Sequence, residues 1–232
     1  MIDIHNHILF NVDDGVKRLE DSIAILKSYE QMGVKAVMVT PHYAPKRGYY
    51  KTPSALNEQF LKLKQAALEA NLKVTLFLGS EIDWSEKYLD EVAFAPSLYG
   101  TNYVLMDFGA GSPDIEEVVY ELGLRNYKVV IAHAERYPSM TLEKWKRVKK
   151  VGGIIQVNAK HLMKLGTKSA QKWAKLFLKE EMIDIVASDL HRKENVEHLK
   201  KAYKTVAKKT SENYAKQLFA NNPLKIIDGT FK

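Results

Sequence analysis

The first seven residues, Met1-Ile2-Asp3-Ile4-His5-Asn6-His7, decide how the rest of this 232-residue chain is interpreted. Apolar and polar residues alternate in this stretch, which predicts a short strand. Side chains two residues apart on a strand point to the same side, so His5 and His7 are expected to converge at the strand end. Two converging imidazoles form half of a metal site. For an isolated pair, two surface histidines at a frayed terminus are an equally good interpretation.

Composition limits the classes of protein to consider. The chain has no cysteine, so any metal site must use imidazole and carboxylate ligands. No apolar run approaches the roughly 20 residues of a membrane helix, and Met1 leads directly into the first strand without a signal peptide. We therefore expect a soluble, cytoplasmic protein without membrane insertion. The net charge of +7 suits an anionic partner. Nucleic acid is one candidate, although lysine-rich helical stretches are typical of solvated helix faces.

Apolar runs recur at a spacing of roughly thirty residues, with helical patterns between them. The predicted strands cover residues 1–7, 36–42, 74–79, 103–108, 128–132, 153–158 and 184–188. The predicted helices cover residues 19–32, 52–70, 86–92, 114–124, 141–150, 168–179, 196–208 and 211–220, and Pro223 is expected to end the last one. This order indicates parallel strands buried on both faces. We expect a single α/β domain over residues 1–232. A (β/α)7-type barrel, one strand short of the TIM barrel, is favoured over a doubly wound open sheet.

Metal-capable side chains stand at six of the seven predicted strand ends, and the active site of a parallel barrel lies at those ends. The candidate ligands are His5, His7, His42, Glu81, Asp107, His133, Asp189 and His191, with Asp14 or Asp13 as a ninth. One ion uses three or four protein ligands, so nine ligands indicate two or three ions with a bridging carboxylate. Such ligands suit Mn, Fe, Co or Zn. A multinuclear site of this kind clamps a phosphoryl group, which points to hydrolysis of a phosphoester.

Two arginines near the strand ends are candidates for binding phosphate. Arg136 follows His133 by three residues, and its guanidinium can bind phosphate bidentately. The alternative is a surface ion pair between Arg136 and Glu135. Arg47, in the basic loop after His42, could do the same work or belong to a solvated loop.

Six motifs along the chain carry a family resemblance. They are His5-Asn6-His7, Asp13-Asp14-Gly15, Thr40-Pro41-His42, Gly79-Ser80-Glu81, His133-Ala134-Glu135-Arg136-Tyr137 and Ala187-Ser188-Asp189-Leu190-His191. The motifs resemble those of the polymerase-and-histidinol-phosphatase (PHP) superfamily. More narrowly, they resemble its tyrosine-protein phosphatases of capsule and exopolysaccharide biosynthesis in Gram-positive bacteria. The resemblance implies a distorted TIM-like barrel of the PHP fold that holds three metal ions, usually assigned as Mn²⁺.

Carried over position by position, the resemblance also implies roles for single residues. His5, His7, Glu81 and Asp189 would hold the first ion; Glu81, Asp107 and His133 the second; and Asp14, His42 and His191 the third. Arg136 would bind the phosphate, and Arg47 is a looser match to a basic loop position. The chain departs from the family pattern at Asp107, where Glu is frequent, and after His191, where it reads Arg192-Lys193-Glu194-Asn195.

The activity implied by the resemblance is hydrolysis of phosphotyrosine on the tail of a cognate tyrosine autokinase of polysaccharide biosynthesis. In this hypothesis, a hydroxide that bridges the metal ions attacks phosphorus while Arg136 helps to neutralise the phosphoryl oxygens. The first alternative is a PHP phosphatase for a small phosphomonoester such as histidinol phosphate. An amidohydrolase is less favoured, because Asp107 stands where that class commonly has a modified Lys. A nucleic-acid-binding protein without enzyme activity leaves the ligand pattern unexplained.

Overall fold

The structure is a computed structural model that describes residues 1–109 and 113–231. Its strands are β1 (Ile2–Asp3), β2 (Ala36–Val39), β3 (His42–Tyr43), β4 (Thr75–Leu78), β5 (Glu81–Asp83), β6 (Tyr103–Asp107), β7 (Lys128–Ile131), β8 (Ile154–Asn158) and β9 (Ile185–Ala187). Its helices are α1 (Leu19–Gln31), α2 (Pro53–Glu69), α3 (Tyr88–Phe94), α4 (Ile115–Leu124), α5 (Leu142–Lys150), α6 (Ala159–Leu162), α7 (Lys168–Lys179), α8 (His198–Lys209), α9 (Glu212–Lys216) and α10 (Asn222–Ile227). Every strand and helix predicted from the sequence has a counterpart. None of the helices in these ranges is long and apolar enough to cross a membrane.

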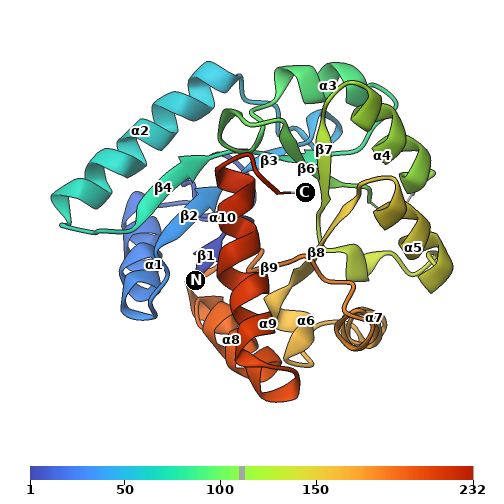
Figure 1. Ribbon diagram of the computed structural model, residues 1–232. Coiled ribbons are helices and arrows are strands. Elements are labelled where there is room, and N and C mark those ends of the chain that lie inside the picture. The colour runs from blue at the N-terminus through green and yellow to red at the C-terminus, as the bar shows by residue number, and fades with distance from the viewer. Residues whose placement is uncertain (110–112, 232) are drawn as a thin grey trace.

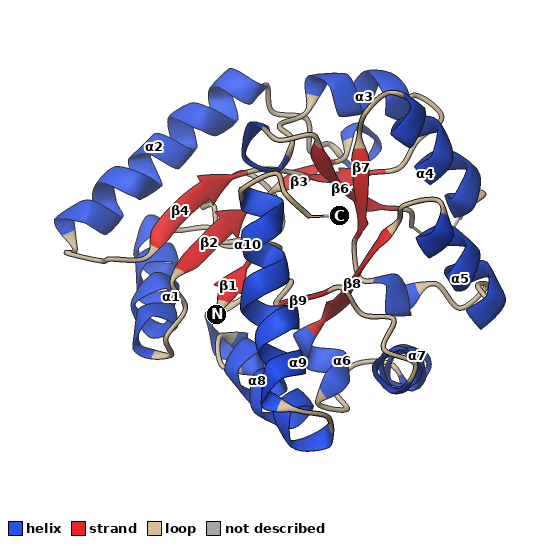
Figure 2. Ribbon diagram, in the orientation of Figure 1, coloured by secondary structure: helices blue, strands red, loops and turns tan. Residues whose placement is uncertain are grey.

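The strands form a closed barrel with the helices outside it (Figures 1 and 2). The segments β2 and β3 belong to one run that is interrupted before His42 by Pro41, which has no N–H to donate. The segments β4 and β5 form another such run, so the barrel has the seven predicted strands. All pairs among them are parallel. The ring closes where the His7 N–H donates to the Leu190 carbonyl at 2.8 Å. This closure confirms the barrel and makes the open-sheet alternative wrong.

The strand residues alternate between two apolar cores. In β6, Tyr103 and Leu105 belong to the core inside the barrel, whereas Val104 and Met106 pack outward in the larger core beneath the helices. The inward series continues to Asp107 at the carboxyl end of the strand. The barrel interior is therefore apolar below and becomes polar at the carboxyl ends.

The C-terminal helices close the other end of the barrel, and Figure 1 shows α10 lying across it. Ile226 and Ile227 of α10 belong to the inner core of the barrel. The helical run continues from α9 through a π-helical turn, Gln217–Asn221, into α10, so the prediction that Pro223 ends the helix is wrong. Pro223 lies in the first turn of α10, where a proline is tolerated because the i→i−4 bond of its missing N–H is not needed there.

Two glycines outside the site provide a matched stability test of the packing. Gly153 precedes β8, and a Cβ added there would lie 2.9 Å from the Val148 carbonyl oxygen. Gly123 lies in α4, and a Cβ added there meets no atom within 4 Å. We expect Gly123→Ala to raise the Tm by about 1 to 4 °C, because alanine stabilises a helix. Gly153→Ala should lower it by at least about 2 °C, because the backbone must move. Calorimetry that gives both variants the same shift would contradict the described packing.

Candidate metal centre

All nine candidate ligands gather at the carboxyl ends of the strands. Three groups of them have ligand atoms within 4.8 Å of one another: His7, Asp14, His42 and His191; His5, His7 and Glu81; and Glu81, Asp107 and His133. Asp189, which is in none of these three groups, places Oδ1 3.7 Å from His5 Nε2 and 3.6 Å from His7 Nε2. Since His7 and Glu81 each belong to two groups, the three groups form one continuous cluster.

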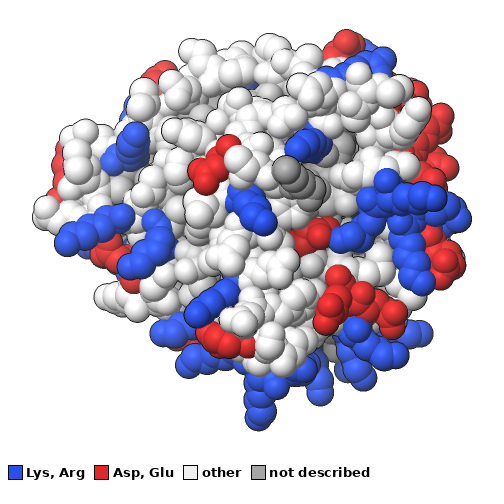
Figure 3. Space-filling view, viewed as in Figure 1, with Lys and Arg blue, Asp and Glu red and all other residues white. Residues whose placement is uncertain are grey.

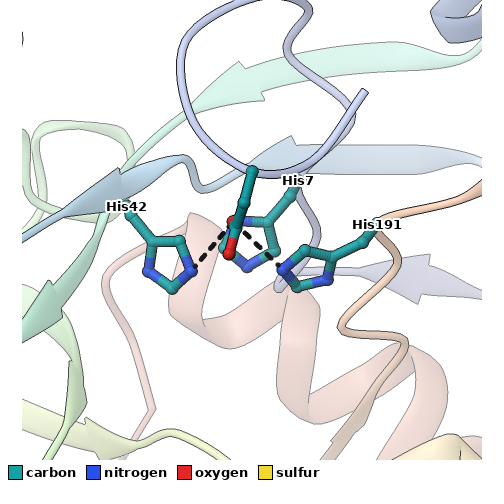
Figure 4. A group of neighbouring side chains, drawn as sticks. His7, His42 and His191 are labelled. Carbon is teal, nitrogen blue, oxygen red and sulfur yellow. Dashed lines mark ion pairs between the residues drawn. The ribbon is translucent and has the colours of Figure 1, made fainter. Parts of the chain in front are cut away.

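Figure 4 shows how one end of the cluster is built, with the imidazoles of His7, His42 and His191 turned toward a common centre. One oxygen of Asp14 lies 3.4 Å from His42 Nε2 and 3.5 Å from His191 Nε2. The rings of His7 and His191 stack with their centroids 4.0 Å apart. These residues come from three separate segments of the chain, so the barrel itself brings them together.

The donor atoms around Glu81 fit metal ions better than they fit direct hydrogen bonds. Glu81 Oε2 lies 3.1 Å from His7 Nε2, and Oε1 lies 3.2 Å from His5 Nε2. Although these distances are short, the Nε2 atoms of both histidines and Glu81 Oε2 are buried without a hydrogen-bond partner in the described chain. Two ligands that are each about 2.1 Å from one ion lie about 3.0 to 3.4 Å apart. Buried polar atoms normally have partners, so bound ions would satisfy these atoms.

The cluster changes the pKa values of its members. Burial alone lowers the pKa of His7, but Asp13 and Glu81 outweigh burial and raise it well above the usual value. Burial alone raises the pKa of Glu81, but His5 and His133 outweigh it and lower the pKa well below the usual range. Without metal, these shifts favour a proton on His7 next to an ionised Glu81. A metal ion would replace that proton.

The backbone is strained at two of the strand ends. His133 has φ 36° and Asp189 has φ 52°, in the left-handed region that side-chain-bearing residues rarely adopt. Such conformations cost about 1 to 3 kcal/mol each and concentrate at functional sites. At His133 the turn is held by Gln156, whose Oε1 accepts the backbone N–H at 2.9 Å and also lies 2.9 Å from His5 Nδ1. Gln156 was not predicted from the sequence. Its polar side chain within the apolar run of β8 is the signal that could have identified it.

Asp13 and Asp14, both offered as the ninth ligand, have different positions. Asp14 lies within the cluster, whereas the buried Asp13 lies outside the cluster and supports two of its histidines. Asp13 Oδ2 lies 2.8 Å from His7 Nδ1 and accepts the His42 backbone N–H at 2.9 Å. Burial alone raises the pKa of Asp13, but its bonds with the His7 ring and with two backbone N–H groups lower it to about 2. The turn needs glycine at Gly15, because a Cβ there would overlap His7.

The alternative in which Arg136 pairs with Glu135 is wrong. Glu135 is fully buried, and its Oε1 accepts the Asn158 backbone N–H at 3.0 Å and lies 2.5 Å from His161 Nδ1. The Asn158 side chain donates in turn to Asp189 Oδ2 at 2.6 Å. Glu135 therefore ties the loop after β7 to β8 and helps to hold the edge of the cluster.

The two predicted phosphate-binding arginines lie in different surroundings. Arg136 has an exposed side chain, and within residues 1–109 and 113–231 it makes no ion pair within 4 Å. Partial desolvation of its guanidinium beside the cluster lowers its pKa, but nearby carboxylates, first of all Asp107 and Asp189, outweigh this and raise it. Arg47 instead pairs with Asp14 Oδ2 at 3.1 Å and with Asp83 Oδ2 at 3.3 Å. Arg136 is therefore the arginine that is available to an incoming anion.

Comparison with known proteins agrees with this geometry. Residues 1–228 match the family described as "Capsular polysaccharide synthesis, CpsB/CapC". The chain belongs to this family. It is 33% identical to the tyrosine-protein phosphatase CpsB of Streptococcus pneumoniae, with 98% of each chain covered. It is 30% identical to the tyrosine-protein phosphatase YwqE of Bacillus subtilis, with 82% of this chain and 77% of that protein covered.

Solved structures show the same relationship. The fold is similar to one described as YwqE from Bacillus subtilis and CpsB from Streptococcus pneumoniae, "unique metal-dependent tyrosine phosphatases". This match has a TM-score of 0.88 and 25% identity over 99% of this chain and 95% of that chain. A phosphotriesterase from Mycobacterium tuberculosis has a TM-score of 0.60 at 12% identity over 98% of this chain and 93% of that chain, which shows a shared fold alone. The family resemblance and the barrel predicted from the sequence are thereby confirmed.

The raised pKa of His7 leads to a prediction about metal binding. Because this pKa is raised, the ring holds its proton at neutral pH, and an incoming ion must displace it. We expect Mn²⁺ binding at pH 7 to release about one proton per chain or more, and the apparent affinity to rise with pH. Titration calorimetry in buffers of different ionisation enthalpy measures the protons released. Binding without proton release, with an affinity that does not change between pH 6 and pH 8, would contradict the prediction.

A second prediction concerns Asp13, which orients His7 without belonging to the cluster. Asp13→Asn keeps the shape but weakens the hold on the His7 ring, so Mn²⁺ affinity should fall by about 10- to 100-fold. Asp21→Asn is the matched control, because Asp21 pairs with the exposed Arg18 instead. Calorimetric titration of both variants measures the effect. Equal affinities in the two variants would show that Asp13 does not support the metal centre.

Proposed function

We propose that this chain is a metal-dependent protein-tyrosine phosphatase that hydrolyses phosphotyrosine. The observation that carries the proposal is the continuous cluster of nine imidazole and carboxylate groups with Arg136 beside it. Relatives in the same family are named tyrosine-protein phosphatases, which supports phosphotyrosine as the substrate. The alternative of a small phosphomonoester such as histidinol phosphate is not favoured by these relatives.

The proposed metal ligands are the nine residues of the sequence analysis. They are His5, His7, Asp14, His42, Glu81, Asp107, His133, Asp189 and His191. We propose Mn²⁺ as the native ion, in two or three copies, on a single PHP-type domain that spans residues 1–232. The three adjoining groups of ligand atoms support this count. Fe, Co and Zn accept the same mixture of imidazole and carboxylate.

The chain's own residues define the rest of the mechanism. Bound metal ions would supply Lewis acidity toward the phosphoryl oxygens and activate water for attack on phosphorus. Arg136 binds the phosphoryl oxygens and stabilises the charge that they carry in the transition state. The leaving tyrosine has a pKa of about 10, so it departs without a strong general acid. The chain has no cysteine, which excludes a phosphocysteine intermediate.

The proposed physiological substrate is the phosphotyrosine-bearing tail of a tyrosine autokinase of polysaccharide biosynthesis. The family description, capsular polysaccharide synthesis, supports this context. A cytoplasmic location belongs to the same proposal, and cell fractionation tests it.

The direct test is phosphate release from a phosphotyrosine peptide. We expect hydrolysis with Mn²⁺, almost complete loss after thorough chelation, and recovery when Mn²⁺ is returned, because the metal ions activate the nucleophile. Histidinol phosphate, assayed in parallel, should be hydrolysed far more slowly. Activity that survives chelation would contradict the metal mechanism, and a preference for histidinol phosphate would contradict the proposed substrate.

Arg136→Gln provides a second arm of this test. The variant should lower kcat/KM by about 100-fold or more, because a charged donor to the phosphoryl group is lost. Arg125→Gln is the control, since Arg125 caps α4 and bonds to the Glu121 carbonyl. Similar values of kcat/KM in the two variants would show that Arg136 does not bind the phosphoryl group.

A further inference from the structure

Charge is strongly segregated along the chain. Residues 81–121, from β5 to α4, carry 10 Asp and Glu against one Lys, a net charge of −9. Residues 141–209, from α5 to α8, carry 18 Lys and Arg against 7 Asp and Glu, a net charge of +11. Figure 3 shows Lys and Arg along the lower edge of the molecule, where α7 to α9 lie. These two segments of the barrel therefore differ strongly in net charge.

A cavity of about 450 Å³ lies on the basic side, next to the metal centre. Arg136 and Lys160 line it, and Lys160 Nζ is 3.5 Å from Asp189 Oδ2 at the edge of the cluster. Its other wall includes Thr167 and Ser169 at the beginning of α7. Thr167 caps this 12-residue helix, and the N-terminus of a helix favours negative charge. Two cations, hydroxyl groups and a helix N-terminus thus face one space.

The inner wall of the cavity contains an acidic residue. Glu135 is fully buried and lines the cavity, and its Oε2 has no hydrogen-bond partner in the part of the chain that the structure describes. Its other oxygen is already engaged by His161 and by the Asn158 backbone. Because Oε2 is itself buried, a bound ligand does not reach it, and the groups available to a ligand are the two cations and the start of α7.

We propose that this cavity, beside Arg136, binds a second anionic side chain of the substrate peptide, close in sequence to the phosphotyrosine. The inference rests on the proposed phosphatase function and adds a determinant of substrate choice. Lys160 and the N-terminus of α7 bind the anion. A carboxylate and a second phosphotyrosine share this chemistry.

The test compares phosphotyrosine peptides that differ only at one neighbouring position, which carries Glu, Gln or a second phosphotyrosine. Each position close to the phosphotyrosine is scanned on both sides. At the preferred position, we expect the KM of the Glu peptide to be about five- to tenfold below that of the Gln peptide, with kcat little changed. A larger gain with phosphotyrosine than with Glu identifies the second phosphate as the preferred ligand. Equal KM values at every position would overturn the proposal.

Two variants locate the effect in the cavity. Ser169→Asp places a negative charge there, at a helix start that tolerates it, and Lys160→Gln removes a positive charge. In both variants, the KM of the Gln peptide should exceed that of the Glu peptide by only about twofold or less. Lys209→Gln is the matched control, because it removes the same charge at the far end of α8. If the full KM difference between the two peptides persists in the first two variants, or if it decreases equally in Lys209→Gln, the assignment to this cavity is overturned.

The same experiment separates this inference from the proposed function. If the Gln peptide is hydrolysed but the Glu peptide has no advantage, only the cavity proposal fails. If no phosphotyrosine peptide is hydrolysed, the proposed function fails. In that case, fluorescence polarisation with peptides that carry a non-hydrolysable phosphonate still decides the cavity proposal. Tighter binding of the acidic peptide, lost in Ser169→Asp, would support it, and equal binding would overturn it.

Discussion

The structure depends on one buried carboxylate that four imidazoles surround. Glu81 Oε1 lies 3.2 Å from His5 Nε2 and 2.9 Å from His133 Nε2. Its Oε2 lies 3.1 Å from both His7 Nε2 and His42 Nδ1. His5 and His7 follow β1, His42 begins β3, Glu81 begins β5 and His133 follows β7. Four strands must therefore be in register before Glu81 has its partners. An unpaired charge at this depth would cost several kcal/mol, so an open barrel would be strongly destabilised. Binding of metal ions would also stabilise the folded barrel.

The barrel separates the part that provides stability from the part that provides chemistry. Below the cluster, the inner core is apolar and is closed by Ile226 and Ile227 of α10. This plug keeps water away from the lower side of the cluster, where a lower dielectric strengthens the interactions of charged groups. At the upper side, left-handed His133 and Asp189 turn the chain at the strand ends. The strain at these two residues is tolerated because β7 and β9 hold the chain before each turn, and Gln156 accepts the His133 backbone N–H.

Local sequence patterns predicted the strands, their parallel arrangement and the nine residues that the barrel gathers. These features follow from periodicity and from the rule that strand ends of a parallel barrel face one opening. The same reasoning did not distinguish the roles of Asp13 and Asp14, because both stand in one turn and only the fold decides which faces the cluster. Gln156 was not predicted as a site residue because its partners, His5 and the His133 backbone, are distant in sequence. The prediction that Pro223 ends the last helix was wrong because a π-helical turn and packing beneath the barrel override the usual effect of proline.

The position of Arg136 links metal binding to substrate binding. Its pKa is raised because the carboxylates of Asp107, Asp189 and Glu81 attract its charge across the opening. Under the proposed function, bound ions neutralise those same carboxylates. The attraction that holds the guanidinium toward the protein then weakens, and its charge is available to the phosphoryl oxygens. A phosphate dianion without metal would instead meet the negative charge of the cluster. Under the proposed function, metal ions bound by these residues would therefore have two roles: they would activate water for attack, and they would change the charge of the site from one that repels phosphate to one that binds it.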